Sequence, residues 1–184
     1  MYILLSTLLL AVINFNAQEA ERVVKAEVVV NAALTDVWAA WTTEAGVKTF
    51  FAPACKIELR AGGAYEMYFN PNGGEGERGG EGNTILAIQP HNMFAFTWNA
   101  PPHFPNVRKQ HTSVVLRFKE IAPGKTRVTL VESGWGEGEE WDQAFAYFNR
   151  AWSEIVLPRL QHRFAHGPLD WNNLPVLSTN NAAK

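Results

Sequence analysis

Large apolar side chains recur at helical spacing near the C-terminal end of the chain. Within residues 139–166, steps of four, three, four and three residues separate Trp141, Phe145, Phe148, Trp152 and Ile155. This spacing predicts one apolar stripe along an α-helix of about seven turns. Because so many large side chains on one face need a large concave partner, we expect a curved sheet to grip the helix and to enclose a cavity with it.

Charged residues and helix breakers mark the ends of this predicted helix. Glu139 lies at its start and Arg163 and His166 lie at its end, where each charge complements the helix dipole. Pro158 removes one backbone hydrogen bond and predicts a kink. Gly167, which precedes a proline, predicts the end of the helix.

Alternating apolar and polar positions before the helix predict an antiparallel meander of about six strands. The predicted strands are residues 56–60, 64–69, 83–89, 93–98, 111–121 and 125–133. A β-rich segment at residues 23–30 predicts an additional first strand. Two short helices are expected after it: one that Thr35 caps and Gly46 ends or bends, and a second at residues 47–51.

A glycine cluster separates two of the predicted strands. Six glycines fall within residues 73–82, which predicts a flexible hairpin connection. A mobile lip over the mouth of a cavity is the alternative. No Gly-Lys-Ser or Gly-Lys-Thr ending is present, so the cluster does not resemble a phosphate-binding loop.

Composition favours a single packed domain. The chain has 184 residues, of which 47% are hydrophobic and 18% charged, so a sizeable core is expected. A net charge of −2 gives no basic footprint for nucleic acid. The single Cys55 excludes an intramolecular disulfide and any site with several cysteine ligands, and we expect it to be a buried, inert thiol.

The N-terminal segment resembles a secretory signal peptide. Residues 3–13 form an apolar run that is too short for a membrane span, which needs about 20 residues. Cleavage is expected after Ala17, although the run lacks a preceding Lys or Arg and Phe15 is bulky for a cleavage site. A first strand or a misassigned start is the alternative. We therefore expect a secreted or periplasmic protein, with a cytoplasmic one as the alternative, and no membrane span after cleavage.

The expected domain organisation has three parts. These are a signal peptide at 1–17, one domain at 21–167 and a polar tail at 168–184.

One carboxylate is a candidate for chemistry. Glu132 shares a strand face with Val128 and Leu130, so it is expected to point inward, where burial would raise its pKa and suit it to acid or base catalysis. The alternative is that Glu132 reaches water at the end of its strand or caps the following helix. Thr112 is the nearest candidate for a second polar group.

Metal binding is not predicted. His162 and His166 are four residues apart on the helix, a spacing that a metal can use, but their complement to the helix dipole is the simpler account. No cofactor is predicted.

The aromatic content points to a cavity lining. Seven Trp and eleven Phe residues are many for this length. The predicted ligand-cavity residues are Trp41, Trp98, Thr112, Phe118, Glu132, Trp135, Phe148 and Trp152. Ordinary core packing is the alternative for each aromatic side chain, because a cavity bordered by all of them would leave the domain poorly packed.

Several motifs occur in an order that resembles a known superfamily. They are residues 35–42 (TDVWAAWT), 62–65 (GGAY), 94–98 (FAFTW), 126–135 (TRVTLVESGW) and the final helix with Trp152. Together they resemble the helix-grip fold of the START-like (SRPBCC) superfamily, in the branch homologous to the activator of the heat-shock protein 90 ATPase. The resemblance covers residues 23–166. It implies an α+β fold in which a curved antiparallel sheet of about six to seven strands surrounds a long C-terminal helix, with two short helices after the first strand.

Three functions are compatible with this resemblance, since its members bind apolar or polycyclic ligands, act as cyclases or dehydratases, or assist chaperones. The favoured hypothesis is a module that binds a small apolar or amphipathic molecule. The first alternative is a cyclase- or hydrolase-type enzyme that uses Glu132 as acid or base. The second is a protein-interaction or chaperone-activating domain, whose surface would be the glycine cluster and residues 101–105; export from the cytoplasm would argue against it.

Overall fold

The computed structural model describes residues 21–177. The predicted signal segment and residues 178–184 lie outside this part. No helix among the described residues is both long and apolar enough to cross a membrane.

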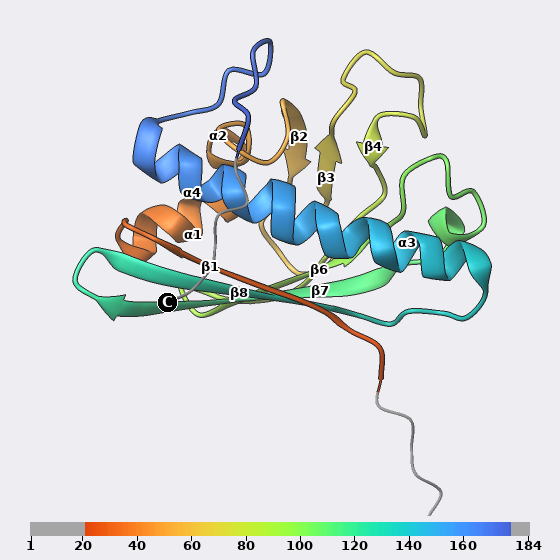
Figure 1. Ribbon diagram of the computed structural model, residues 1–184, viewed down its shortest axis with the longest axis horizontal. Coiled ribbons are helices and arrows are strands. Elements are labelled where there is room, and N and C mark those ends of the chain that lie inside the picture. Colours follow the sequence, from red (N-terminus) through yellow and green to blue (C-terminus); the bar gives the residue numbers. More distant parts are fainter. Residues whose placement is uncertain (1–20, 178–184) are drawn as a thin grey trace, which may run out of the picture.

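Eight strands and a long C-terminal helical segment form the domain (Figure 1). The strands are β1 (Val24–Val30), β2 (Ala54–Ile57), β3 (Tyr65–Tyr68), β4 (Gly79–Gly80), β5 (Ile85–Gln89), β6 (Met93–Trp98), β7 (Thr112–Ala122) and β8 (Lys125–Ser133). The helices are α1 (Leu34–Thr42), α2 (Glu44–Val47), the 3-10 turn η1 (Val107–Lys109), α3 (Glu139–Arg150), the π turn η2 (Ala151–Val156) and α4 (Leu157–His166).

The strands are arranged in two antiparallel sheets that meet edge to edge. The five-stranded sheet has the order β1-β8-β7-β6-β5, and the three-stranded sheet has the order β2-β3-β4. A bridge between Ala64 and Thr84 and a 2.9 Å hydrogen bond from Tyr65 N to Asn83 O join β3 to the segment before β5. The two sheets therefore continue into each other around the core.

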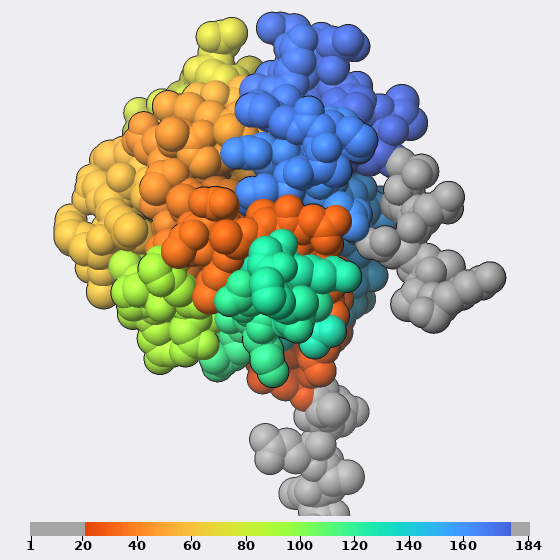
Figure 2. All heavy atoms as spheres, turned by 90° about the vertical axis from the view of Figure 1, so that its left-hand side faces the viewer, coloured from red at the N-terminus to blue at the C-terminus, as the bar shows by residue number. Residues whose placement is uncertain are grey.

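The helical segment α3–η2–α4 lies across the sheets, with α4 and α1 near one end of the molecule (Figure 1). Figure 2 shows this end, where α1, α4 and the turn between β7 and β8 lie close together. The predicted α+β fold with a curved antiparallel sheet and a long C-terminal helix is confirmed.

Aromatic side chains fill the space between sheet and helix. Phe94, Phe96 and Trp98 of β6 are all buried, because alternate residues of a strand share one face. Trp41 of α1 packs edge-on against Phe50, with ring centroids 5.0 Å apart. These contacts leave the aromatic core continuous from the short helices to β6.

The start of the first helix differs from the prediction. α1 begins at Leu34, so Thr35 lies inside it, and Ala33 occupies the N-cap position without a side-chain hydrogen bond. The helix ends at Thr42 rather than at Gly46, and the Thr43 hydroxyl caps α2 by accepting from Gly46 N at 3.0 Å. Gly46 serves close packing instead, since a Cβ there would lie 2.3 Å from Ala39 O.

A wide π turn interrupts the C-terminal helix. Trp152 is 1% exposed, and the buried positions that follow it are Val156, Leu157 and Leu160. The prediction that Ile155 is part of the buried stripe is wrong, because the π turn adds a residue and leaves Ile155 44% exposed. Pro158 lies in the first turn of α4, where a missing N–H is tolerated.

Candidate functional site

A cavity of about 440 Å3 lies among η2, the end of β6 and the loops around β4. This volume is within the range of small-molecule sites. Its aromatic walls are Phe51, Phe69, Trp98, Tyr147, Phe148 and Trp152. Its polar side chains are Asn70, Glu77, Arg78, Asn99, His103 and Arg159.

The rim of the cavity carries exposed apolar side chains. Phe69 is 45% exposed and Ile155 is 44% exposed, and both line the cavity. The same π turn that leaves Ile155 out of the core thus places it at the mouth. Apolar side chains that a protein leaves in water beside a cavity are typical of a binding site.

Gly80 permits the close approach of Trp98 to the glycine-rich segment. A Cβ at this position would lie 3.1 Å from Cη2 of Trp98, which is tighter than ordinary contact. Trp98 itself is 3% exposed and stacks on Phe51, with ring centroids 5.6 Å apart. Because Gly80 has no side chain, β4 packs directly against the ring of Trp98.

Two charged side chains fix the glycine-rich segment in place. Glu81 accepts hydrogen bonds from Gly76 N at 3.0 Å and from Arg78 Nε at 2.7 Å, while Arg108 donates to Gly79 O at 2.8 Å. Burial alone would raise the pKa of Glu81, but these hydrogen bonds outweigh it and lower the pKa. Hydrogen bonds to Glu81 and Arg108 therefore hold the glycine-rich segment in one position beside the cavity.

Glu132 is fully buried beneath this aromatic wall. Its Oε1 accepts from Thr112 Oγ1 and its Oε2 accepts from Trp152 Nε1, each at 2.6 Å. Burial raises the pKa of Glu132 to about 7, even though both hydrogen bonds favour the charged form. The carboxyl group therefore titrates near neutral pH.

The hydroxyl of Thr112 has two acceptors within hydrogen-bond distance. Thr112 Oγ1 lies 3.0 Å from Trp98 O and 2.6 Å from Glu132 Oε1, but it has only one proton to donate. When Glu132 is protonated, its carboxyl can donate to Thr112, which can then donate to Trp98 O. When Glu132 is ionised, the same proton must serve the carboxylate, and Trp98 O loses this donor.

The predicted ligand-cavity residues separate into three groups. Trp98, Phe148 and Trp152 border the cavity. Thr112 and Glu132 lie behind them, joined to Trp98 and Trp152 by hydrogen bonds.

The other three predicted residues lie elsewhere. Trp41 and Phe118 are part of the core, where Phe118 packs edge-on against Trp38 with ring centroids 5.3 Å apart. Trp135 packs against Phe148 at a centroid distance of 5.9 Å and donates to Glu132 O, but it does not border the cavity.

Most lining residues were missed from the sequence, among them Phe51, Phe69 and Arg159. Phe51 and Phe69 belong to segments that only the folded chain brings beside the C-terminal helix. Arg159 follows Ile155 by four residues, a spacing that places both on one helix face, and this was the signal that could have found it.

Family comparison agrees with this geometry. The family described as Activator of Hsp90 ATPase homolog 1-like protein matches residues 31–165, well over half of the sequence. The chain belongs to this family. The predicted branch of the helix-grip, START-like superfamily is therefore confirmed. No curated protein matches this chain significantly.

Solved structures share the fold of this family member. Protein MLL2253 from Mesorhizobium loti has a TM-score of 0.62 at 16% identity, covering 80% of this chain and 100% of the other. The Aha1 dimer from Colwellia psychrerythraea has 0.60 at 16%, covering 79% and 98%. PFC0360w, an HSP90 activator from Plasmodium falciparum, has 0.56 at 10%, covering 73% and 90%. At these identities the likeness shows the fold alone.

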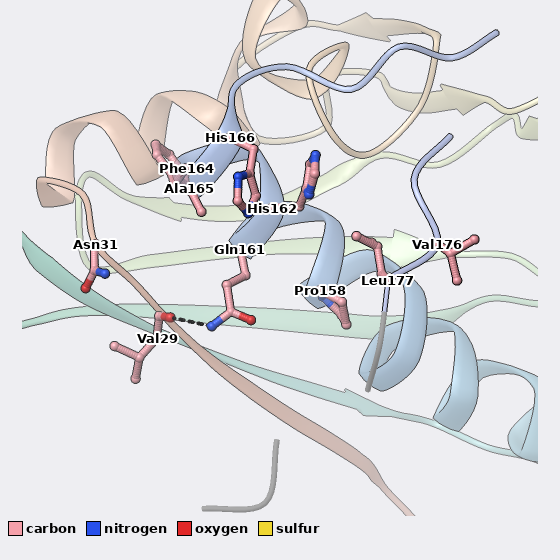
Figure 3. Close-up of a pocket in the computed structure, with 10 residues that line it drawn as sticks. All are labelled: Val29, Asn31, Pro158, Gln161, His162, Phe164, Ala165, His166, Val176 and Leu177. Carbon is pink, nitrogen blue, oxygen red and sulfur yellow. Dashed lines mark hydrogen bonds between the residues drawn. The ribbon is translucent and has the colours of Figure 1, made fainter. Parts of the chain in front are cut away.

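A second, more polar groove of about 410 Å3 lies between α4 and β1 (Figure 3). His162 and His166 line it with ring centroids 4.7 Å apart, and Gln161 Nε2 donates to Val29 O at 3.5 Å. Within residues 21–177, no group of three or more His, Cys, Asp or Glu side chains is arranged to hold a metal ion.

Cys55 is buried away from both cavities. Burial raises the pKa of its thiol to about 11, so the thiolate is scarce at neutral pH.

Proposed function

We propose that this protein binds a small apolar or amphipathic molecule in the cavity between η2 and β4. The observation that carries the proposal is the aromatic wall of Trp98, Phe148 and Trp152 with the exposed rim residues Phe69 and Ile155. A bound apolar molecule would remove this surface from water, which is favourable by about 25 cal/mol for each Å2.

The cavity lining also offers polar partners. Asn99, His103 and Arg159 lie among its aromatic side chains. An amphipathic ligand, which has an apolar body and a polar group, therefore suits the cavity better than a pure hydrocarbon.

Catalysis by Glu132 is the alternative favoured by the raised pKa of this carboxyl. A general acid must come within hydrogen-bond reach of its substrate. Glu132 does not border the cavity, and Thr112 and Trp152 already donate to both of its carboxyl oxygens. The reaction would require Trp152 to move aside.

Activation of a chaperone ATPase is the second alternative, and it rests on family membership alone. No contact of the described residues distinguishes a docking surface for such a partner.

Truncation of the rim tests the binding proposal. The neutral dye N-phenyl-1-naphthylamine fluoresces when it enters an apolar site, so its titration measures the affinity directly. Phe69→Ala should weaken binding roughly tenfold, because the ligand loses an aromatic contact surface. Leu59→Ala is the matched control, since Leu59 is 47% exposed and lies outside the cavity.

Two results would count against the proposal. One is the absence of dye binding to the unmodified protein. The other is an equal loss of affinity in the Phe69 and Leu59 variants.

A further inference from the structure

Arg159 lies at the cavity without a compensating charge. Its side chain is half-buried and lines the cavity, and its guanidinium carbon lies 5.4 Å from the ring centroid of Trp171. Within residues 21–177, no carboxylate forms an ion pair with it, and no oxygen or nitrogen accepts a hydrogen bond from it. Burial lowers the pKa of the Arg159 guanidinium.

The other arginine of the cavity is different. Arg78 donates to Glu81 at 2.7 Å and stacks over the ring of Tyr68 at 4.5 Å. Its charge is already balanced within the protein. The single carboxylate that lines the cavity, Glu77, is solvent-exposed, so water and salt screen its charge.

A partly desolvated guanidinium needs acceptors for its five N–H donors. Arg159 follows Ile155 by one helical turn, so the two side chains share the helix face that lines the cavity. The planar fork of arginine matches the geometry of carboxylates and related anions, which it can bind through two parallel hydrogen bonds.

We propose that Arg159 binds an anionic group of the ligand. The cavity then takes an amphipathic anion, whose aromatic or apolar body lies against Trp98 and Trp152 and whose carboxylate- or sulfonate-like group pairs with Arg159. This inference rests on the proposed function and specifies the ligand class of the same site.

Two dyes that share one scaffold test the proposal. 1-Anilinonaphthalene-8-sulfonate carries a sulfonate, whereas N-phenyl-1-naphthylamine is its neutral counterpart. In Arg159→Gln, the affinity for the anionic dye should fall roughly tenfold, the scale of a lost charge-assisted hydrogen bond, while the affinity for the neutral dye stays within about twofold. Added salt should lower the affinity of the unmodified protein for the anionic dye and should have little effect on the affinity of the variant.

Control variants separate this contact from general effects. Arg150→Gln removes the same charge from an exposed position outside the cavity and should leave both affinities unchanged. Arg159→Met keeps an apolar stem against Trp171, so it repeats the test if Arg159→Gln does not fold. The ratio of the two dye affinities is compared within each variant.

The outcomes distinguish the two proposals. If the neutral dye binds and Arg159→Gln leaves the anionic dye unaffected, the anion site is wrong while the binding function stands. An equal loss in Arg150→Gln would also overturn the anion site, because a long-range field would explain it. If neither dye binds the unmodified protein, the binding function itself is wrong.

Discussion

Glu132 links the protonation state of one residue to the stability of the whole domain. Its pKa is about 7 in the folded protein, against an ordinary value of 4.5. A raised folded-state pKa means that the folded protein binds the proton more tightly than the unfolded chain does. Its contribution is therefore fully present below pH 4.5 and is lost as the pH rises through 7, a change of about 3 kcal/mol.

Glu132→Gln should remove this dependence on pH. The amide mimics the neutral acid, since it can accept from Trp152 and donate to Thr112. We expect the variant to be more stable than the unmodified protein at pH 8 and nearly equal to it at pH 4.5. Urea unfolding at several pH values gives the two profiles.

The exposed Glu75→Gln variant is the control for a general change in charge, and it should keep the slope of the unmodified protein. A Glu132→Gln profile that still falls between pH 4.5 and 7 would show that another group carries the effect.

At the scale of elements, the sequence predicted the strands with clean alternation. Residues 93–98 and 125–133 were predicted with the bounds that the structure has, because each has alternating faces between clear turn residues. The end of the C-terminal helix at Gly167, with φ 100°, also followed from its residue type.

The π turn could not be predicted from the same pattern. A step of three residues from Trp152 to Ile155 fits an α-helix. A step of five residues from Trp152 to Leu157 fits a π turn equally well, so the spacing of apolar residues does not distinguish the two structures. The choice depends on the tertiary contact that holds Trp152 Nε1 on Glu132 and leaves Ile155 at the cavity rim. Phe51 and Phe69 could not be assigned to the cavity from the sequence either, because only the folded structure brings them beside the C-terminal helix.

Deleting Glu154 tests the role of this wide turn. The deletion shortens the step from Trp152 to Leu157 from five residues to four, which an ordinary α-helix accommodates on one face. We expect the domain to stay folded with a loss of about 1 kcal/mol or less. Binding of N-phenyl-1-naphthylamine should weaken, because the residues at the cavity wall rotate.

Insertion of one alanine after Glu154 is the opposite change. It lengthens the same step to six residues and turns Leu157 and Leu160 away from the core. We expect a loss of about 2–5 kcal/mol, the scale of a lost buried leucine. If thermal unfolding shows both variants equally destabilised, the wide turn is not an adjustable register between α3 and α4.

In the molecule as a whole, four distant parts of the chain build one site. The cavity takes Phe51 from the segment after α2, Phe69 from the segment after β3, Trp98 from β6 and Arg159 from α4. Phe51 stacks on Trp98, and the C-terminal helix closes the space. The order of motifs along the chain is enough to predict the family-level fold. The lining of the cavity depends instead on how these distant segments pack, which the sequence pattern does not show.

The contacts of the domain indicate that it can fold without the N-terminal segment. The described contacts begin at Glu21, whose Oε1 accepts a hydrogen bond from Gly134 N at 3.3 Å. The next residue, Arg22, donates to Asp142 at 2.6 Å, and its guanidinium carbon lies 4.5 Å from the ring centroid of Phe145. Cleavage after Ala17 would leave these contacts intact. We propose export and expect the protein purified from its own host to have a mass that begins near Gln18. A protein that retains Met1 and stays in the cytoplasm would contradict export and would strengthen the chaperone hypothesis.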